Sequence, residues 1–418
     1  MKILMLHNGY RIRGGEDESF ETECRMLRDA GHVVETIHVS NDTVDETGKI
    51  TVALQSVWSK PSYERVDRCL QSNRFDVLHV QNFFPLLSPS VYAAARKHNV
   101  AVVQTLRNYR LLCANTFLFR DGHVCEDCAQ KTFKYPAVLH ACYRNSRLGS
   151  LTVAAMCGLH SLAGTWRKGV DLYISLTEFA RQKYIQAGFP PEKIVTKGNC
   201  VHPDPGGGRG DGGFVLFVGR LSAEKGVRTL LDAWDRLRPD SGLKIAGEGP
   251  LAAELRARSR HIPGVEWLGA KTSSEVKDLM GAARVTVFCS EWYETFGRVA
   301  IESFAKGTPV IASRIGALSE VVKHMRTGLL FEPGNSEDLA LQLKWCFEHP
   351  QEIADMRLQA RSEYERNYRA EANCRKLIEC YELAIELAER EARARDFAQP
   401  NRHRPGLLPS LRRVSTRN

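Results

Sequence analysis

The chain has 418 residues and a net charge of +9 at pH 7, and 43% of its residues are hydrophobic and 26% are charged. This length favours two large domains, and the composition excludes an intrinsically disordered protein. Seven arginines and two acidic residues follow Arg390, so the rest of the chain is only mildly basic. That charge suits nucleotides and lipid phosphates. No helix-turn-helix, zinc-finger repeat or RNA-binding motif indicates a nucleic-acid partner.

The N-terminal stretch MKILMLHNGYRIRGGED becomes polar after six residues, which is not the pattern of a secretory signal. We therefore expect a cytoplasmic protein whose twelve cysteines are thiols or metal ligands rather than disulfides. The longest apolar stretch, 148–164, is rich in small residues and too short to predict a membrane span.

Short apolar runs alternate with helical patterns over the first 200 residues. Strands are predicted at 2–8, 32–39, 75–80, 100–105, 171–177 and 193–198, and helices at 16–31, 88–99 and 177–188. This alternation indicates a parallel sheet with helices on both faces.

A change of composition separates the two halves of the chain. HPDPGGGRGDGG (202–213) consists mainly of Gly, Pro and Asp and predicts a linker. A second alternation follows, with strands predicted at 214–220, 243–250, 265–270, 284–290, 308–313 and 328–334. We therefore predict an α/β fold in which two doubly wound, Rossmann-like parallel-sheet domains face a cleft.

The predicted domain boundaries follow from this division. Residues 1–200 form the first domain and 201–364 the second, and a helix at about 365–391 packs back on the first domain. The remaining segment, 392–418, is rich in Arg and Pro and is expected to be a disordered basic tail.

Two positive charges flank a turn at the end of one predicted strand. GRLSAEKG (219–226) places Arg220 at the strand end and Lys225 five residues later. Ligands of open parallel sheets bind beyond the carboxyl ends of the strands. An arginine fork and a mobile lysine there suit a diphosphate. The alternative interpretation is a solvated basic turn.

A second strand end carries AGEGP (246–250). Gly247 and Glu248 follow the strand directly, and glycine lets the backbone approach a flat ligand closely. We predict that both residues contact the substrate. The alternative is a simple turn, which the same sequence also suits.

Two glutamates flank a predicted strand-to-helix junction in EWYETFGRVAIES (291–303). Glu294 lies in the loop, and Glu302 lies about one and a half turns into the helix that Gly297 opens. Backbone amides near Phe296 and Gly297 favour partial negative charge on a ligand. We predict that Glu302 binds a ribose diol and Glu294 the transferred sugar. The alternative is one ordinary helical glutamate and one in a loop.

Together these motifs resemble the retaining glycosyltransferases of family 4, which have the GT-B fold. The similarity covers about residues 1–390 and rests on the E-x7-E pattern of Glu294 and Glu302 and on the pair Arg220 and Lys225. It implies a hexosyltransferase-type enzyme that uses a nucleoside-diphosphate sugar, retains the anomeric configuration and requires no metal for the chemistry. The subgroup looks like those that build bacterial surface polysaccharides, with a glycan or polyprenyl-linked acceptor in the first domain.

The resemblance extends to the first domain. In RIRGGED (11–17), Gly14 and Gly15 occupy the place of the family's glycine pair, which approaches the donor phosphates. Two positions depart from the family pattern: Gln81 replaces a common second histidine, and Arg107 replaces the histidine of the HNYR motif. Arginine can hold a phosphate but cannot replace a neutral imidazole.

We therefore predict that Arg107 acts at the reaction centre beside Arg220, Lys225 and Glu294. The two departures also leave a catalytically impaired sugar-nucleotide-binding protein as an alternative. A nucleotide-sugar epimerase of similar fold is a further alternative, although its catalytic acids are not evident.

Four cysteines in the first domain have the spacing C-x11-C-x2-C-x13-C and form a candidate metal site. They are Cys113, Cys125, Cys128 and Cys142. FLFRDGHVCEDC (117–128) predicts a hairpin with an Asp-Gly turn that leads into a CxxC knuckle, which suits a structural zinc ion. The alternative is four buried thiols.

Basic residues flank the apolar stretch 148–164. They are Arg144, Arg147, Arg167 and Lys168. This arrangement suits an interfacial helix at the inner face of the cell membrane, and burial in the core of the domain is the alternative.

Overall fold

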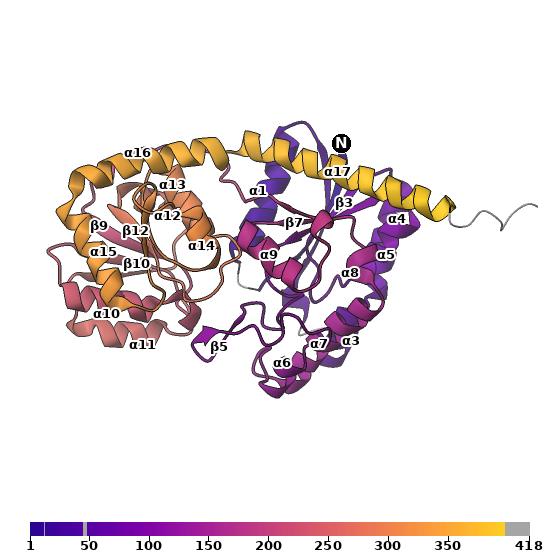
Figure 1. Ribbon diagram of the computed structural model, residues 1–418, viewed down its shortest axis with the longest axis horizontal. Coiled ribbons are helices and arrows are strands. Elements are labelled where there is room, and N and C mark those ends of the chain that lie inside the picture. The colour runs from indigo at the N-terminus through magenta and orange to yellow at the C-terminus, as the bar shows by residue number, and fades with distance from the viewer. Residues whose placement is uncertain (12, 45–47, 398–418) are drawn as a thin grey trace, which may run out of the picture.

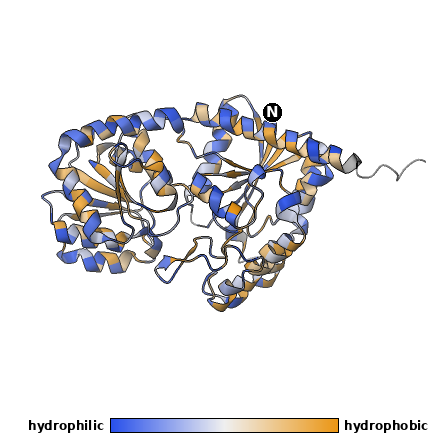
Figure 2. Ribbon diagram, in the orientation of Figure 1, coloured by the Kyte–Doolittle hydropathy of each residue, from blue (hydrophilic) through white to orange (hydrophobic). Residues whose placement is uncertain are grey.

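The computed structural model describes residues 1–11, 13–44 and 48–397. In this part of the chain, two sheets of six parallel strands form the centres of two domains (Figure 1). Hydrophobic residues concentrate on these strands, while the surrounding helices mix hydrophobic and hydrophilic residues (Figure 2). The predicted α/β fold with two parallel-sheet domains is confirmed.

The first sheet has the order β2-β1-β3-β4-β7-β8. Its strands are β1 (Lys2–Gly9), β2 (Val33–Ser40), β3 (Val77–Asn82), β4 (Ala101–Leu106), β7 (Leu172–Ser175) and β8 (Ile194–Thr196). Ile3 and Met5 of β1 belong to the core on one face, and Leu4 and Leu6 to the core on the other. Burial on both faces explains why these strands are continuous apolar runs in the sequence.

Helices cover both faces of this sheet. They are α1 (Gly15–Asp29), α3 (Lys49–Val57), α4 (Lys60–Ser72), α5 (Ser90–Lys97), α6 (Tyr135–Leu139), α7 (Arg147–Leu162), α8 (Thr165–Lys168) and α9 (Glu178–Gln186). The predicted hairpin consists of β5 (Phe119–Arg120) and β6 (His123–Val124). It turns at Asp121 and Gly122, both with positive φ, as an Asp-Gly pair favours.

The second sheet has the order β11-β10-β9-β12-β13-β14. Its strands are β9 (Phe214–Val218), β10 (Gly242–Ala246), β11 (Val265–Gly269), β12 (Val285–Phe288), β13 (Val310–Ser313) and β14 (Gly328–Phe331). The helices of this domain are α10 (Val227–Leu237), α11 (Ala252–Arg258), α12 (Ser273–Ala282), α13 (Arg298–Ala305), α14 (Gly316–Val321), α15 (Ser336–Glu348) and α16 (Pro350–Asn367).

The predicted linker 202–213 is held against the second domain by its own backbone. The amide of Gly208 donates to the carbonyl of Lys306 at 2.8 Å, and that of Gly210 donates to Gly281 at 2.9 Å. A Cβ atom on Gly208 would come within 2.2 Å of the Gly281 backbone. The glycines here therefore allow close packing rather than flexibility.

The chain returns to the first domain through a break between two helices. The predicted helix at about 365–391 is α17 (Ala370–Phe397), which packs on β4 and β7 of the first sheet. It begins later than predicted because α16 ends before Tyr368, whose carbonyl accepts a hydrogen bond from the Val201 amide at 3.1 Å. It also continues past residue 391, and the remainder of the predicted basic tail, 398–418, lies outside the described residues.

The apolar stretch 148–164 forms most of α7. Val153, Met156 and Cys157 on this helix are buried in the core of the first domain, whereas Leu148 and Leu162 are exposed. Across residues 1–11, 13–44 and 48–397, no helix combines the length and hydrophobicity needed to cross a bilayer.

Candidate active site

The strand order of the second sheet reverses between two neighbouring strands, β9 and β12. Such a switch point creates the crevice in which open α/β sheets bind their ligands. Arg220 and Lys225 follow β9, and Glu294 follows β12. Three of the predicted site residues are therefore brought to one crevice by the topology.

Glu294 and Lys225 form an ion pair, with 2.5 Å between Lys225 Nζ and Glu294 Oε1. The same oxygen accepts hydrogen bonds from Ser290 Oγ at 2.7 Å and Trp292 Nε1 at 2.9 Å. No described residue donates to Oε2, and 10% of the side chain remains exposed. One carboxylate oxygen is thus fixed by the protein, and the other can accept a hydroxyl of a ligand.

Arg220 lies at the boundary between the domains. Its Nη2 donates to Glu224 Oε1 at 3.0 Å, and Glu224 is held in turn by the Ser222 hydroxyl at 2.6 Å. The ring of Phe117, from the first domain, lies 6.0 Å from Arg220 Cζ. The arginine side chain is half exposed, so a diphosphate in the crevice can reach its guanidinium.

Glu302 lies on α13, where Arg298 Nε donates to its Oε1 at 2.7 Å. Arg298 also crosses to the first domain, where its Nη1 donates to Ser19 Oγ at 3.1 Å. A Cβ atom on Gly15 would lie 3.8 Å from Arg298 Cδ, and one on Gly14 would meet nothing within 4 Å. The structure therefore brings the predicted glycine pair of the first domain close to Glu302 of the second.

Gly297 and Phe296 directly precede α13, and neighbouring side chains pack closely against both residues. Gly297 has φ 102°, and a Cβ atom there would approach Leu318 to 2.8 Å. The Phe296 ring is buried, packs on Tyr368 and leaves no room for a Cβ atom on Gly198. The Phe296 ring thus packs at the connection between the domains, and the predicted role of the backbone amides near Phe296 and Gly297 stays a prediction.

Gly247 and Glu248 follow β10, and their predicted contact with substrate stays a prediction. Gly247 has φ 152°, and a Cβ atom there would come within 1.9 Å of the Gly219 carbonyl oxygen. Glycine is needed because the ends of β10 and β9 approach closely. Glu248 is exposed and pairs with Arg256 at 2.7 Å, so its side chain points toward α11 rather than to Glu294.

Arg107 occupies a buried network instead of the crevice. Its Nε donates to Gln81 Oε1 at 2.7 Å, its Nη1 bonds to Asn199, and its Nη2 lies 3.2 Å from Glu23 Oε2. Gln81 Nε2 in turn donates to Glu23 at 2.6 Å, and Lys197 Nζ donates to the other Glu23 oxygen at 2.8 Å. The two departures from the family pattern are thus linked, because Gln81 connects Arg107 to Glu23.

Charge balance explains this network. Burial raises the pKa of Glu23, but Lys197 and Arg107 outweigh burial and hold it well below its usual range. Burial also lowers the pKa of His79 to about 3, so this histidine is neutral. Glu23 therefore offsets one of the two buried positive charges and is shared between Lys197 and Arg107. A direct contact between Arg107 and a donor phosphate stays a prediction.

Sequence reasoning missed two polar groups near the predicted site. Arg298, which follows Gly297 directly, links Glu302 to the first domain. Its position between the two glutamates in the sequence could have indicated this role. Glu16, which follows the glycine pair, accepts hydrogen bonds from Asn108 Nδ2 at 3.0 and 3.2 Å. Burial raises the pKa of Glu16.

The four predicted metal ligands surround the hairpin of β5 and β6. Burial, together with the nearby thiols of Cys113 and Cys142, raises the pKa of the Cys128 thiol to about 12. Within the described ranges, no three His, Cys, Asp or Glu side chains converge on a point that could hold a metal ion. The structural zinc ion therefore stays a prediction.

Metal analysis of protein purified without a histidine tag tests the zinc prediction. We expect one zinc ion per chain, and we expect Cys125→Ser with Cys128→Ser to release it and lower stability, because structural zinc contributes directly to folding. Cys289→Ser and Cys346→Ser, at buried cysteines of the second domain, are the matched controls. A protein without zinc, or one that is equally stable with both CxxC cysteines replaced, contradicts the prediction.

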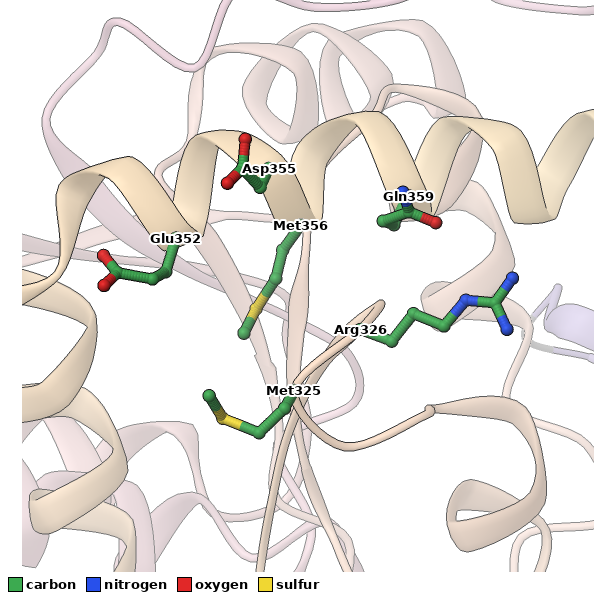
Figure 3. A pocket seen from close by; sticks show the side chains of 6 residues that line it. All are labelled: Met325, Arg326, Glu352, Asp355, Met356 and Gln359. Atoms are coloured by element: carbon green, nitrogen blue, oxygen red, sulfur yellow. The ribbon is translucent and has the colours of Figure 1, made fainter.

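A hollow of about 410 Å³ lies elsewhere on the second domain (Figure 3). It is lined by Met325, Arg326, Glu352, Asp355, Met356 and Gln359. Met325 and Arg326 precede β14, so the hollow lies at the amino end of that strand. The crevice with Glu294 lies at the carboxyl ends of the strands, and this hollow therefore has no part in it.

Comparison with known proteins identifies the family. The glycosyl transferases group 1 family matches residues 204–363, and the glycosyl transferase 4-like domain matches residues 14–200. The chain thus consists mainly of two glycosyltransferase family domains. The two matches meet at residues 200–204, where the chain passes from the first sheet to the second.

Solved structures of other glycosyltransferases share the architecture. Anabaena HepE in complex with UDP and glucose superposes with a TM-score of 0.65 at 19% identity, over 91% of this chain and 98% of that one. At this level of identity the likeness shows the fold, and it confirms the predicted GT-B arrangement of this glycosyltransferase.

Curated relatives match this glycosyltransferase over shorter segments. An uncharacterized glycosyltransferase of Methanocaldococcus jannaschii is 37% identical over 134 residues, which are 30% of this chain and 34% of the relative. The sulfoquinovosyl transferase SQD2 of Arabidopsis thaliana is 30% identical over 203 residues, 48% of this chain and 36% of the relative. The chain thus spans about a third of the length of these relatives.

Proposed function

We propose that this protein transfers a sugar from a nucleoside-diphosphate sugar to a glycan or lipid-linked acceptor. The observation that carries the proposal is the convergence of Arg220, Lys225 and Glu294 at the switch point of the second sheet. Glu302 lies on the helix that follows the same loop. HepE has the same fold and was solved with UDP and glucose, which supports a donor of this class.

The proposed chemistry uses the two cations to stabilise the leaving group. As the bond from the anomeric carbon to the diphosphate breaks, negative charge develops on the diphosphate, where Arg220 and Lys225 stabilise it. The acceptor hydroxyl oxygen bonds to the anomeric carbon, and the departing diphosphate takes its proton. We propose that the configuration is retained and that this step needs no metal.

The acceptor belongs to the first domain in this proposal. Glu16, with its raised pKa, and Asn108 lie at the carboxyl edge of the first sheet, near the glycine pair. Hydroxyl groups of a glycan can bond to both side chains. We propose a cytoplasmic role in bacterial surface-polysaccharide synthesis, with a polyprenyl-linked or glycan acceptor.

Calorimetric titration of two variants tests the donor site. A hydrogen bond to a charged group contributes roughly 1.5–3 kcal/mol, which is about 10- to 150-fold in binding. Glu302→Ala should weaken the nucleoside diphosphate and the intact donor alike by such a factor. Glu294→Ala should weaken the diphosphate much less than Glu302→Ala does, since it removes only the group that positions Lys225. It should weaken the intact donor further, because Glu294 contacts the sugar.

Glu266→Ala is the matched control, since Glu266 also pairs with a lysine of the second domain, Lys244, at 3.4 Å. It should bind both ligands as the unmodified protein does. The division of roles is wrong if Glu294→Ala weakens the bare nucleotide as much as Glu302→Ala does.

A sugar-nucleotide-binding protein without catalysis is the second candidate. The burial of Arg107 favours it, because a guanidinium that bonds to Gln81 inside the protein is not free to bind the donor. Donor hydrolysis without acceptor separates the two functions. A binding protein has affinity for the donor and no turnover, whereas the proposed enzyme releases nucleoside diphosphate slowly.

A further inference from the structure

Exposed hydrophobic side chains gather on three helices of the first domain. α3 and α6 both pack against α7 at one end of this domain, at the lower right in Figure 1. These helices and the residues next to them carry most of the large hydrophobic side chains exposed in the described structure. They are Ile50, Leu54, Trp58, Phe133, Tyr135, Leu139, Leu148, Leu151, Leu159 and Leu162.

The exposed leucines of α7 follow one side of the helix. Leu148, Leu151, Leu159 and Leu162 are spaced so that all four point to the same face. Leu148 is 78% and Leu162 80% exposed. The opposite face of α7 is buried in the core. Both faces of the helix are therefore hydrophobic, and the face that carries the four leucines is exposed to solvent. Isolated exposed leucines need no explanation, but a continuous stripe of them indicates an interaction surface.

α3 and α6 extend this stripe sideways. Ile50, Leu54 and Trp58 lie one helical turn apart along α3 and its end, and Tyr135 and Leu139 do so on α6. His160 of α7 bonds to the carbonyl of Val57 at 2.8 Å, which fixes α3 against α7. The surface is therefore held by the fold, and its tryptophan and tyrosine are the residues typical of the boundary between water and lipid.

The two segments that carry this surface contain basic residues and no acidic ones, although Glu64 and Asp127 lie directly beyond them. Residues 128–170 contain six lysines and arginines and no aspartate or glutamate. Residues 48–63, which include α3, contain two lysines and no acidic residue. Lys131, Arg144, Arg147, Arg167 and Lys168 are at least partly exposed, so their charges can reach an anionic partner.

We propose that α3, α6 and α7 form a docking surface for an anionic lipid bilayer. The leucine stripe enters the boundary between headgroups and acyl chains, and the surrounding cations bind lipid phosphates. A second copy of the chain is the less favourable partner, because a symmetric contact would place the same cations opposite one another. The surface is distinct from the sugar-nucleotide crevice, and the proposal does not depend on the donor site.

Flotation of the full chain with vesicles tests this proposal. We expect binding to vesicles of phosphatidylglycerol and phosphatidylcholine, weaker binding in 0.5 M salt, and little binding to phosphatidylcholine alone, since salt screens the charges. Leu148→Gln with Leu162→Gln should lower the partition into anionic vesicles by about tenfold or more. Both side chains are exposed, so the fold should be unaffected.

Leu341→Gln with Leu358→Gln is the matched control, because these leucines of the second domain are 64% and 71% exposed. It should bind vesicles as the unmodified chain does, and nucleotide binding should be equal in all variants. Vesicle binding that is absent in the unmodified chain, or equal in the α7 variant, overturns the proposal. Dimerisation that the α7 substitutions abolish, without vesicle binding, overturns it in favour of a second copy. Neither result bears on the proposed transferase activity.

Discussion

Replacing Lys225 with alanine is expected to lower the turnover of sugar transfer by about 10²- to 10³-fold, the range seen when one preorganised donor to a developing anion is removed. Lys225 Nζ is already positioned by Glu294 at 2.5 Å. It therefore needs little rearrangement when negative charge develops on the departing diphosphate. Donor affinity should fall as well, but by less than turnover, because the charge is greater in the transition state.

Lys244→Ala, at a partly exposed lysine on the neighbouring strand β10, provides the control and should keep full turnover. Arg220→Ala should act in the same direction as Lys225→Ala. Steady-state kinetics with varied donor distinguish the roles. A higher Michaelis constant with unchanged turnover would mean that Lys225 binds the donor without stabilising the leaving group.

Replacing Glu23 with glutamine is expected to destabilise the fold by about 3–5 kcal/mol, the cost of removing one partner of a buried ion pair. Glu23 is the shared partner of Lys197 and Arg107, all three being buried. The substitution would leave two buried cations without a counter-ion. Denaturant unfolding measures the loss as a lower midpoint with an unchanged slope.

Arg107→Gln provides the comparison within the same network. It should cost less than Glu23→Gln, because Glu23 remains paired with Lys197 at 2.8 Å. It should also leave donor affinity largely unchanged, since the guanidinium is buried and bonds to Glu23, Gln81 and Asn199. A stable Arg107→Gln protein with strongly weakened donor binding would restore the direct phosphate contact that the sequence predicted.

The sequence predicted the fold well because its signals are local. Buried parallel strands are continuous apolar runs, and the Asp121-Gly122 pair specifies a tight turn by its backbone preference. The convergence of Arg220, Lys225 and Glu294 on one crevice was predictable from strand ends, because parallel strands present their carboxyl ends at one edge. The break at Tyr368 was missed because a contact with Val201, distant in the sequence, sets it.

The surroundings of the Arg107 side chain could not be predicted from the neighbouring sequence alone. Its partners Glu23, Gln81 and Asn199 come from three other elements, so only the folded chain shows that they balance its charge. Phe296 presents the same difficulty. Its ring packs on Tyr368, a residue distant in the sequence, so the sequence around Phe296 does not show this contact.

The same distinction applies to the apolar stretch 148–164. Its composition predicts an interfacial helix or a core helix, and the structure shows one buried face and one exposed hydrophobic face. The additional hydrophobic residues on α3 and α6 come from distant segments, and only the fold brings them beside α7.

Release of nucleoside diphosphate from a panel of nucleoside-diphosphate sugars tests the central claim most directly. The measurement compares the unmodified protein with Lys225→Ala and Glu266→Ala, with and without a lipid-linked or glycan acceptor. The account predicts release from at least one donor, faster release with the right acceptor, a loss of about 10²-fold or more in Lys225→Ala and no change in Glu266→Ala. Donor binding without release from any donor, or release at the same rate in Lys225→Ala, would contradict it.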